Sequence, residues 1–307
     1  MIHMTAIPMV HPGTMPERVG TQTDVLGECP LWDDRSQSLF WVDIRSPAIR
    51  RLWLATGEVK SWSMPDLVGS IALTDDDRLL VAMPSQLALF DPASAELATY
   101  VSDLSLPEGH RFNDGRCDAL GRFWVGSMHN ITRAPVGSLY LLEGAGPLKA
   151  VLERVAIPNS LAFSPDGSTL YFADSLQYQI FAHSYDLATG QLGPSRVFAQ
   201  SKPPAFPDGS AVDSEGFLWN AEFNGGRLLR YAPDGRLDRE VHLPVNRPTC
   251  CAFGGPDLDI LFITSTSQGL SDADRLAQPM SGSLMAFRPG VRGRPEPRFA
   301  LAGPRRK

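Results

Sequence analysis

Leu161-Ala-Phe-Ser-Pro-Asp-Gly-Ser-Thr-Leu-Tyr-Phe-Ala173 is the stretch of sequence that decides the fold. An apolar segment runs into a polar turn, and a segment rich in aromatic residues leaves it. The turn follows from its residue types, because aspartate hydrogen-bonds the local backbone and glycine adopts positive φ without steric cost. The stretch therefore predicts a tight β-hairpin.

The same succession of apolar segment, polar turn and aromatic or β-branched segment occurs six times along the chain. The other five copies are Pro30-Leu-Trp-Asp-Asp-Arg-Ser-Gln-Ser-Leu-Phe-Trp-Val-Asp43, Ser70-Ile-Ala-Leu-Thr-Asp-Asp-Asp-Arg-Leu-Leu-Val-Ala82, Gly115-Arg-Cys-Asp-Ala-Leu-Gly-Arg-Phe-Trp-Val-Gly126, Ser210-Ala-Val-Asp-Ser-Glu-Gly-Phe-Leu-Trp-Asn-Ala221 and Cys251-Ala-Phe-Gly-Gly-Pro-Asp-Leu-Asp-Ile-Leu-Phe-Ile-Thr264. The turn aspartates are Asp33, Asp75, Asp118, Asp166, Asp213 and Asp257. They are roughly 42 to 48 residues apart, about the length of one four-stranded propeller blade.

Six such units predict an all-β fold, a six-bladed β-propeller, over residues 19–300. An α/β domain would need amphipathic runs of ten or more residues between the strands, and none is apparent. Residues 1–18 are assigned to an N-terminal extension and residues 301–307 to a C-terminal tail. The segment around Val19 to Val25 is a candidate for the strand that closes the ring.

Composition excludes several classes of function. The chain has 307 residues and a formal charge of −6 without a long run of either sign, which argues against nucleic acid as a partner. The basic end Arg305-Arg306-Lys307 is interpreted as a solvated terminus. Four cysteines without a CxxC pair predict no disulfide framework. Neither a signal peptide nor an apolar run of about 18 residues is found, so we expect a cytoplasmic protein without a membrane segment.

Polar residues occupy one recurring position of the repeat. Glu28, Asn159 and Asp208 precede the innermost strands of the first, fourth and fifth units, and Arg111-Phe-Asn-Asp-Gly115 precedes that of the third. Taken singly, each has an ordinary interpretation, since Pro-Asp-Gly around Asp208 is a common turn. Together they would converge at one mouth of the propeller. Two carboxylates and an amide oxygen form an oxygen-rich site that suits Ca²⁺, Mg²⁺ or Mn²⁺.

These segments resemble the regucalcin/gluconolactonase family, also called the senescence-marker-protein family, over nearly the full chain. The motifs that carry the resemblance are Gly27-Glu-Cys-Pro-Leu-Trp32, Arg111-Phe-Asn-Asp-Gly115, Pro207-Asp-Gly209, Leu218-Trp-Asn-Ala221 with Asn224-Gly-Gly-Arg227, and Cys251-Ala-Phe-Gly-Gly255. The resemblance implies that Glu28, Asn159 and Asp208 bind one divalent metal ion and that Asp208 is also the catalytic base. It further implies that Arg111 and Asn113 bind the sugar.

The resemblance also places Asp114 close to the substrate, and the chain departs from the family at two points. Ser160 follows Asn159 where the family usually has glycine. Ile131 stands at the spacing where some members place a substrate-binding carboxylate, and His129 or Asn130 is the candidate to replace it.

The chain has no G-x-S-x-G nucleophile motif and no evident Ser-His-Asp set. A metal ion that polarises a carbonyl is an alternative means of hydrolysing an ester. The sequence therefore predicts a metal-dependent hydrolase that opens sugar lactones such as glucono-, galactono-, arabino- or xylonolactone in carbohydrate catabolism. The ion would be Ca²⁺, Zn²⁺, Mn²⁺, Mg²⁺ or Fe²⁺, and the protein a monomer or weak homodimer. A phosphotriesterase or aryl-ester hydrolase, and a non-catalytic calcium-binding propeller, remain as alternatives.

Overall fold

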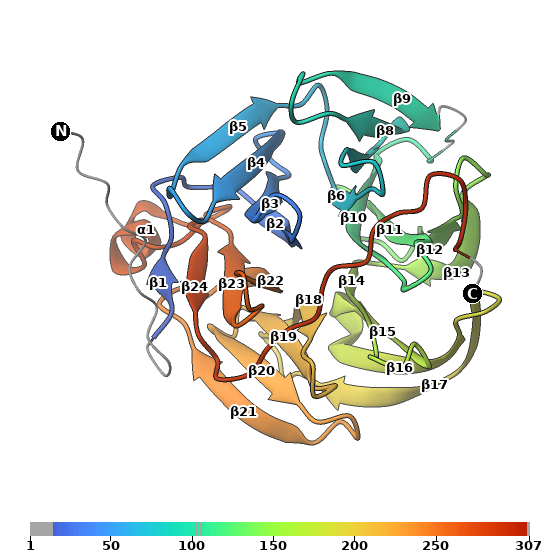
Figure 1. The fold of residues 1–307 in the computed structure, drawn as a ribbon. Coiled ribbons are helices and arrows are strands. Elements are labelled where there is room, and N and C mark those ends of the chain that lie inside the picture. Colours follow the sequence, from blue (N-terminus) through green and yellow to red (C-terminus); the bar gives the residue numbers. More distant parts are fainter. Residues whose placement is uncertain (1–14, 102–103, 105, 306–307) are drawn as a thin grey trace.

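The computed structural model describes residues 15–101, 104 and 106–305, which form six four-stranded sheets around a central axis (Figure 1). In the first five sheets, four consecutive strands run from the axis outward. The first sheet contains β2 (Gly27–Asp33), β3 (Ser38–Asp43), β4 (Ala48–Trp53) and β5 (Val59–Ser63). The second contains β6 (Ser70–Leu73), β7 (Leu79–Met83), β8 (Gln86–Phe90) and β9 (Leu97–Val101). The third contains β10 (His110–Cys117), β11 (Phe123–His129), β12 (Gly137–Leu142) and β13 (Lys149–Val155). The next two contain β14 (Pro158–Phe163), β15 (Thr169–Asp174), β16 (Gln179–Asp186) and β17 (Gln191–Gln200); and β18 (Phe206–Val212), β19 (Leu218–Phe223), β20 (Arg227–Tyr231) and β21 (Leu237–His242). The predicted all-β six-bladed propeller is confirmed.

The repeated Asp/Gly turns are hairpins between the first and second strands of the blades. Between β14 and β15, the amide of Ser164 donates to the carbonyl of Thr169 at 3.0 Å. Gly167 has a φ of 71° and donates to the carbonyl of Ser164 at 2.9 Å. Asp166 accepts from the amide of Ser168 at 3.0 Å. The turn chemistry that the sequence predicted therefore forms.

The sixth blade joins the two ends of the chain. It consists of β22 (Pro248–Gly254), β23 (Ile260–Ser265), β24 (Met285–Phe287) and, outermost, β1 (Glu17–Arg18). Glu17 pairs with Ala286 and Arg18 with Met285. The closing strand thus lies just before the segment 19–25, within the range that the sequence assigned to an extension. Residues 1–14 of that extension lie outside the described residues.

Apolar side chains fill the wedges between neighbouring blades. Six main clusters of buried residues each contain side chains from two adjacent blades. Trp62 of the first blade meets Phe90 of the second at a ring-centroid distance of 5.4 Å. Trp124 of the third blade meets Tyr185 of the fourth at 5.7 Å. Fully burying such a side chain contributes about 1.5–3 kcal/mol, so the ring is stabilised by contacts between blades.

After β24 the chain crosses the centre of one face of the propeller (Figure 1). The carbonyl of Arg292 accepts from Ser214 at 2.8 Å, and Phe299 donates to the carbonyl of Leu73 at 2.7 Å. The amide of Arg305 donates to the carbonyl of Leu120 at 2.9 Å. The expected tail is therefore bound to the propeller through residue 305, and residues 306–307 lie outside the described part of the chain.

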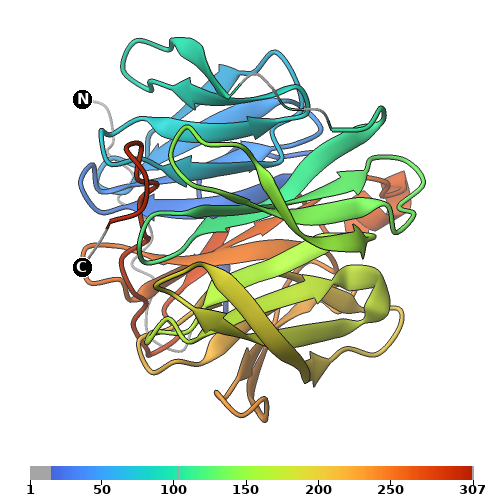
Figure 2. The same ribbon diagram turned by 90° about the vertical axis from the view of Figure 1, so that its right-hand side faces the viewer.

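Helical structure is confined to two short elements in the described residues, η1 (Ser175–Gln177) and α1 (Asp272–Ala277). Helix α1 and the C-terminal segment lie on opposite faces of the disc (Figure 2). None of the helices that the structure describes has the length and apolar character needed to cross a membrane.

Candidate functional site

Five of the six innermost strands carry a β-bulge near their first residues. The register breaks fall between Glu28 and Leu31, Phe112 and Gly115, Asn159 and Ala162, Pro207 and Ser210, and Pro248 and Cys251. A bulge adds a residue to one strand and re-aims a side chain. The sequence placed Glu28, Asn159 and Asp208 in loops before the strands. They lie inside β2, β14 and β18, at these bulges.

Two bulges use a backbone conformation that is uncommon for residues with a side chain. Cys29 has a φ of 49° and Ser160 a φ of 60°. The glycine that the family usually has at the position of Ser160 would adopt this conformation without strain. The Ser160 hydroxyl lies 2.6 Å from that of Ser210 in the next blade. This departure from the family pattern therefore leaves the bulge, and with it Asn159, in place.

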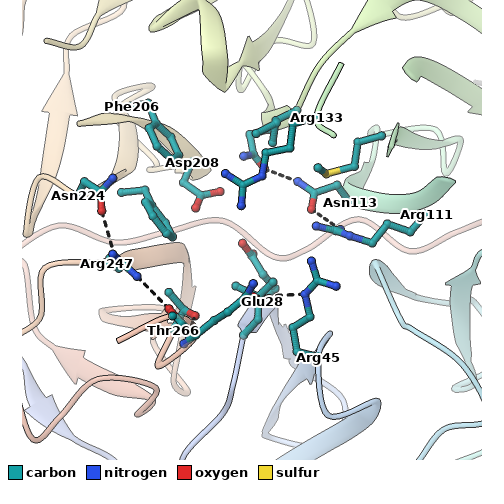
Figure 3. Close-up of a pocket in the computed structure, with 17 residues that line it drawn as sticks. Glu28, Arg45, Arg111, Asn113, Arg133, Phe206, Asp208, Asn224, Arg247 and Thr266 are labelled. Atoms are coloured by element: carbon teal, nitrogen blue, oxygen red, sulfur yellow. Dashed lines mark hydrogen bonds between the residues drawn. The ribbon is translucent and has the colours of Figure 1, made fainter. Parts of the chain in front are cut away.

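The bulges surround a cavity of about 300 Å³ at the mouth of the propeller (Figure 3). Five predicted site residues line it, namely Glu28, Arg111, Asn113, Asn159 and Asp208. Their side chains are between 3% and 8% exposed. Gln268 and Gly269, which precede α1, complete the wall on the side of that helix. The five predicted residues come from four different blades, and Gln268 and Gly269 add the sixth blade to the wall.

Hydrogen bonds connect the predicted sugar ligands with the predicted metal ligands. Arg111 donates from Nη1 to Oδ1 of Asn113 at 2.6 Å, and Asn113 donates from Nδ2 to Oδ1 of Asn159 at 2.8 Å. Asn159 donates in turn from Nδ2 to Oγ of Ser175 at 2.8 Å. Ser175 donates to the carbonyl of Pro207, next to Asp208, at 2.7 Å. Each side chain is therefore oriented by its neighbour.

The two carboxylates of the cavity are in an unfavourable environment for negative charge. Burial, with a further contribution from the charge of Asp114, raises the pKa of Glu28 to about 8. Burial also raises the pKa of Asp208 well above its ordinary value, and the charges of Glu28 and Asp114 add to that rise. A cation between the carboxylates would remove this penalty.

The donor set fits one hard divalent cation. Glu28 and Asp208 supply carboxylate oxygens and Asn159 an amide oxygen, which are ligands that Ca²⁺, Mg²⁺ and Mn²⁺ accept together with water. Among residues 15–101, 104 and 106–305, no group of three His, Cys, Asp or Glu side chains is arranged to hold a metal. The fit therefore depends on the amide oxygen of Asn159, which is fixed by its bonds to Asn113 and Ser175.

Asp114 and His129 lie outside the cavity wall. Asp114 is buried, and its Oδ2 accepts from the amide of Leu161 at 2.8 Å. His129 accepts at Nδ1 from the amides of Ile131 and Thr132 and packs against His110, with ring centroids 5.3 Å apart. Their direct contact with substrate stays a prediction.

The segment that lacks the family's carboxylate adopts a different role. The side chain of Ile131 is 81% exposed and does not line the cavity. Asn130 accepts from Nε of Arg111 at 3.1 Å, so it orients an arginine of the cavity wall. Asn130 is thus linked to the site through Arg111.

Several polar residues of the wall were not found from the sequence. They are Arg45, Arg133, Asn224, Arg247, Thr266 and Gln268. All except Arg247 lie in the loops between the second and third strands of their blades, and these loops differ in length and sequence. Asn224 belongs to a motif that carries the family resemblance, but the sequence predicted no role for its side chain. The pairing of Arg247 with Asn224, at 3.1 Å between Nε and Oδ1, depends on the packing of two blades.

Comparison with known proteins agrees with this arrangement. The model of the SMP-30/Gluconolactonase/LRE-like region matches residues 26–267. A 6-deoxy-6-sulfogluconolactonase of Pseudomonas putida is 37% identical, over 91% of this chain and 96% of that protein. An L-arabinolactonase of Azospirillum brasilense is also 37% identical, over 95% and 97%.

The crystal structure of a calcium-binding protein, regucalcin, from Agrobacterium tumefaciens superposes with a TM-score of 0.88 at 32% identity. The superposition covers 94% of this chain and 98% of that one. The family model, the sequence relatives and the fold agree, and the chain belongs to the SMP-30/gluconolactonase/LRE-like family.

Proposed function

We propose that this protein is a metal-dependent hydrolase that opens sugar lactones to aldonic acids. The observation that carries the proposal is the convergence of Glu28, Asn159 and Asp208 beside the bonded pair Arg111 and Asn113 in one polar cavity. The names of two relatives at 37% identity, a sulfogluconolactonase and an arabinolactonase, support it.

In the proposed reaction, Glu28, Asn159 and Asp208 hold the cation. When bound, a divalent cation polarises the lactone carbonyl and stabilises the negative charge that develops on its oxygen. Asp208 accepts a proton from the attacking water and returns it to the ring oxygen that leaves, so the ester bond is replaced by a carboxylic acid and a hydroxyl group. Arg111 and Asn113 orient the sugar hydroxyls, which keeps the carbonyl carbon within reach of the water.

The proposal is tested with protein freed of metal by a chelator and reloaded separately with Ca²⁺, Mg²⁺, Mn²⁺ or Zn²⁺. A panel of pentono- and hexonolactones is followed by acid release, with metal content measured on the same samples. We expect opening only in reloaded protein, with kcat/KM of about 10⁴ M⁻¹ s⁻¹ or more for at least one lactone. Full activity in metal-free protein would overturn the metal requirement. Faster turnover of an aryl ester or phosphotriester than of every lactone would overturn the substrate class.

Substitution of Asn113 tests the link between sugar and metal ligands. Asn113→Ala removes the donor that orients Oδ1 of Asn159. Losing such a support of a metal ligand typically weakens metal binding by roughly 10- to 100-fold. We expect that loss in a calorimetric metal titration. Asn246→Ala, at an exposed asparagine outside the cavity wall, is the control and should bind metal as the parent does. Parental affinity in Asn113→Ala would contradict the orienting role.

A further inference from the structure

The cavity wall carries more positive than negative side chains. Its charged residues are Arg45, Arg111, Arg133 and Arg247 against Glu28 and Asp208. With both carboxylates ionised, four positive and two negative charges leave an excess of two, and a bound divalent cation would double it. The chain as a whole has a formal charge of −6, so the excess of positive side chains at this mouth is local.

The arginines of the wall are engaged by neutral groups. Arg45 donates from Nε to Oε1 of Gln268 at 3.3 Å. Arg247 donates to Oδ1 of Asn224 and, from Nη1, to the carbonyl of Gln268 at 2.9 Å. Among the residues that the structure describes, the ion pairs all involve other arginines, lysine or histidine. The nearby Asp274 instead caps α1 through Ser271.

Three of the arginines repel one another. Burial, and then the neighbouring charge of Arg45, lowers the pKa of Arg111 to about 10; Arg133 adds to this effect, while the charges of Glu28 and Asp208 oppose it. Burial and the charge of Arg133 likewise lower the pKa of Arg45. Arg133 itself is exposed and lines the rim of the cavity. Arg247 lies across the cavity from Arg111 (Figure 3).

A neutral sugar gives no reason for this cluster. Hydroxyl groups are bound well by neutral donors and acceptors, and Arg111 with Asn113 already provides both. Unpaired guanidinium groups held close together are unfavourable, and an anion with several oxygens would relieve that repulsion. The product carboxylate forms at the reacting carbon beside Asp208, which leaves Arg45 and Arg133 free for a second anionic group.

We propose that the substrate is an anionic lactone, with a carboxylate or phosphate group on the carbon chain, and that Arg45 and Arg133 bind this group. The inference rests on the proposed lactonase function and adds the charge of its substrate. Arg45 and Arg133 determine specificity, whereas the ring-opening chemistry belongs to the residues around Asp208.

The test compares pairs of lactones in which one member carries an anionic group at C6 and the other a hydroxyl group. D-Glucono-1,4-lactone is paired with D-glucaro-1,4-lactone, and D-glucono-1,5-lactone with its 6-phosphate, all with metal-loaded protein. We expect kcat/KM to be about tenfold or more higher for the charged member of at least one pair, since a hydrogen bond to a charged group has at least that effect. High salt should narrow the difference, because it screens exposed charges. Which pair responds distinguishes carboxylate from phosphate recognition.

Arg45→Gln and Arg133→Gln remove one charge each and keep a polar side chain. Each should reduce the preference for the charged lactone by roughly tenfold. Arg236→Gln, at an exposed arginine of the β20–β21 turn away from the cavity wall, should leave the preference unchanged. Equal kcat/KM for both members of both pairs would overturn the proposal. It would also be overturned if the variants lowered turnover of neutral and charged lactones alike, as expected for arginines that serve only the product carboxylate.

A binding measurement separates this inference from the proposed function. Calorimetry compares 6-phosphogluconate with gluconate on the metal-loaded protein and on Arg133→Gln. If no lactone is opened but 6-phosphogluconate binds about tenfold tighter than gluconate, and this difference is lost in the variant, the lactonase function fails and the anion site stands. If lactones are opened but the two acids bind equally, the anion site fails and the lactonase function stands.

Discussion

Replacement of Asp208 by asparagine is expected to lower kcat for lactone opening by roughly 10² or more at saturating metal, because general-base catalysis contributes about 10²–10⁴ in rate. The amide keeps an oxygen for the metal but accepts a proton poorly, so the variant separates the two roles assigned to Asp208. We expect metal to bind to Asp208→Asn at reduced affinity, with residual turnover. The checks are steady-state kinetics at several metal concentrations and metal content at each.

The chain provides a matched control for this substitution. Pro233-Asp234-Gly235 repeats the tripeptide around Asp208 on the opposite side of the fifth blade, in the β20–β21 turn. Asp234 is exposed and accepts from the amide of Arg236 at 2.9 Å. Asp234→Asn should therefore leave kcat and metal content at parental values. If Asp208→Asn retains activity within a few-fold of the parent at full metal occupancy, the proton acceptor must lie elsewhere, with Asp114 as the next residue to replace.

Pro-Asp-Gly occurs three times in the chain, and the segments around Asp208 and Asp234 show what the sequence alone can predict. A tripeptide of this kind is typical of a turn, and the segment around Asp234 is one. The segment around Asp208 forms a β-bulge within β18, because Phe206, Pro207 and Ser210 pair with β19 on either side of it. Bulges depend on the register of a partner strand, which a local pattern does not contain. Convergence was predictable from the repeat, whereas the bulge that produces it was not.

Most arginines of the cavity could not be predicted from the sequence. Arg111 was found because it stands next to Asn113 at a repeated position. Arg45 and Arg133 lie in the loop between the second and third strands of their blades, two residues beyond β3 and four beyond β11, whereas Arg247 lies in the connection between β21 and β22. Their proximity arises from the arrangement of the blades around the axis. Side chains at different positions in loops of different length leave no periodic signal in the sequence.

The turn aspartates also differ in their surroundings, and therefore in how much each is expected to contribute to the free energy of unfolding. Asp118 and Asp166 both lie in a turn between the first and second strands of a blade, but at different positions, because Ser164 takes the place of Asp118 in the fourth blade. Asp118 is 0% exposed and accepts at Oδ2 from Nε of Arg122 at 2.6 Å and from the hydroxyl of Tyr185 at 2.5 Å. Asp166 is exposed and accepts from Ser164 and Ser168 of its own turn. The marker that predicts a turn in both blades is therefore also the anchor of a buried arginine in one of them.

Asp118→Ala is expected to lower the free energy of unfolding by about 3–5 kcal/mol, because it leaves the buried Arg122 without its hydrogen-bonded carboxylate and with only the half-buried Glu143, 3.8 Å away, as an ion-pair partner. Asp166→Ala removes only exposed hydrogen bonds and should cost about 1 kcal/mol or less. Urea denaturation of the two variants and the parent measures both values. If Asp118→Ala does not fold, Asp118→Asn retains the acceptor for the backbone and should still unfold at lower urea than Asp166→Ala. Equal effects of the two alanine variants would mean that Arg122 finds another partner, and that the turn itself, rather than the buried pair, supplies the stability of this blade.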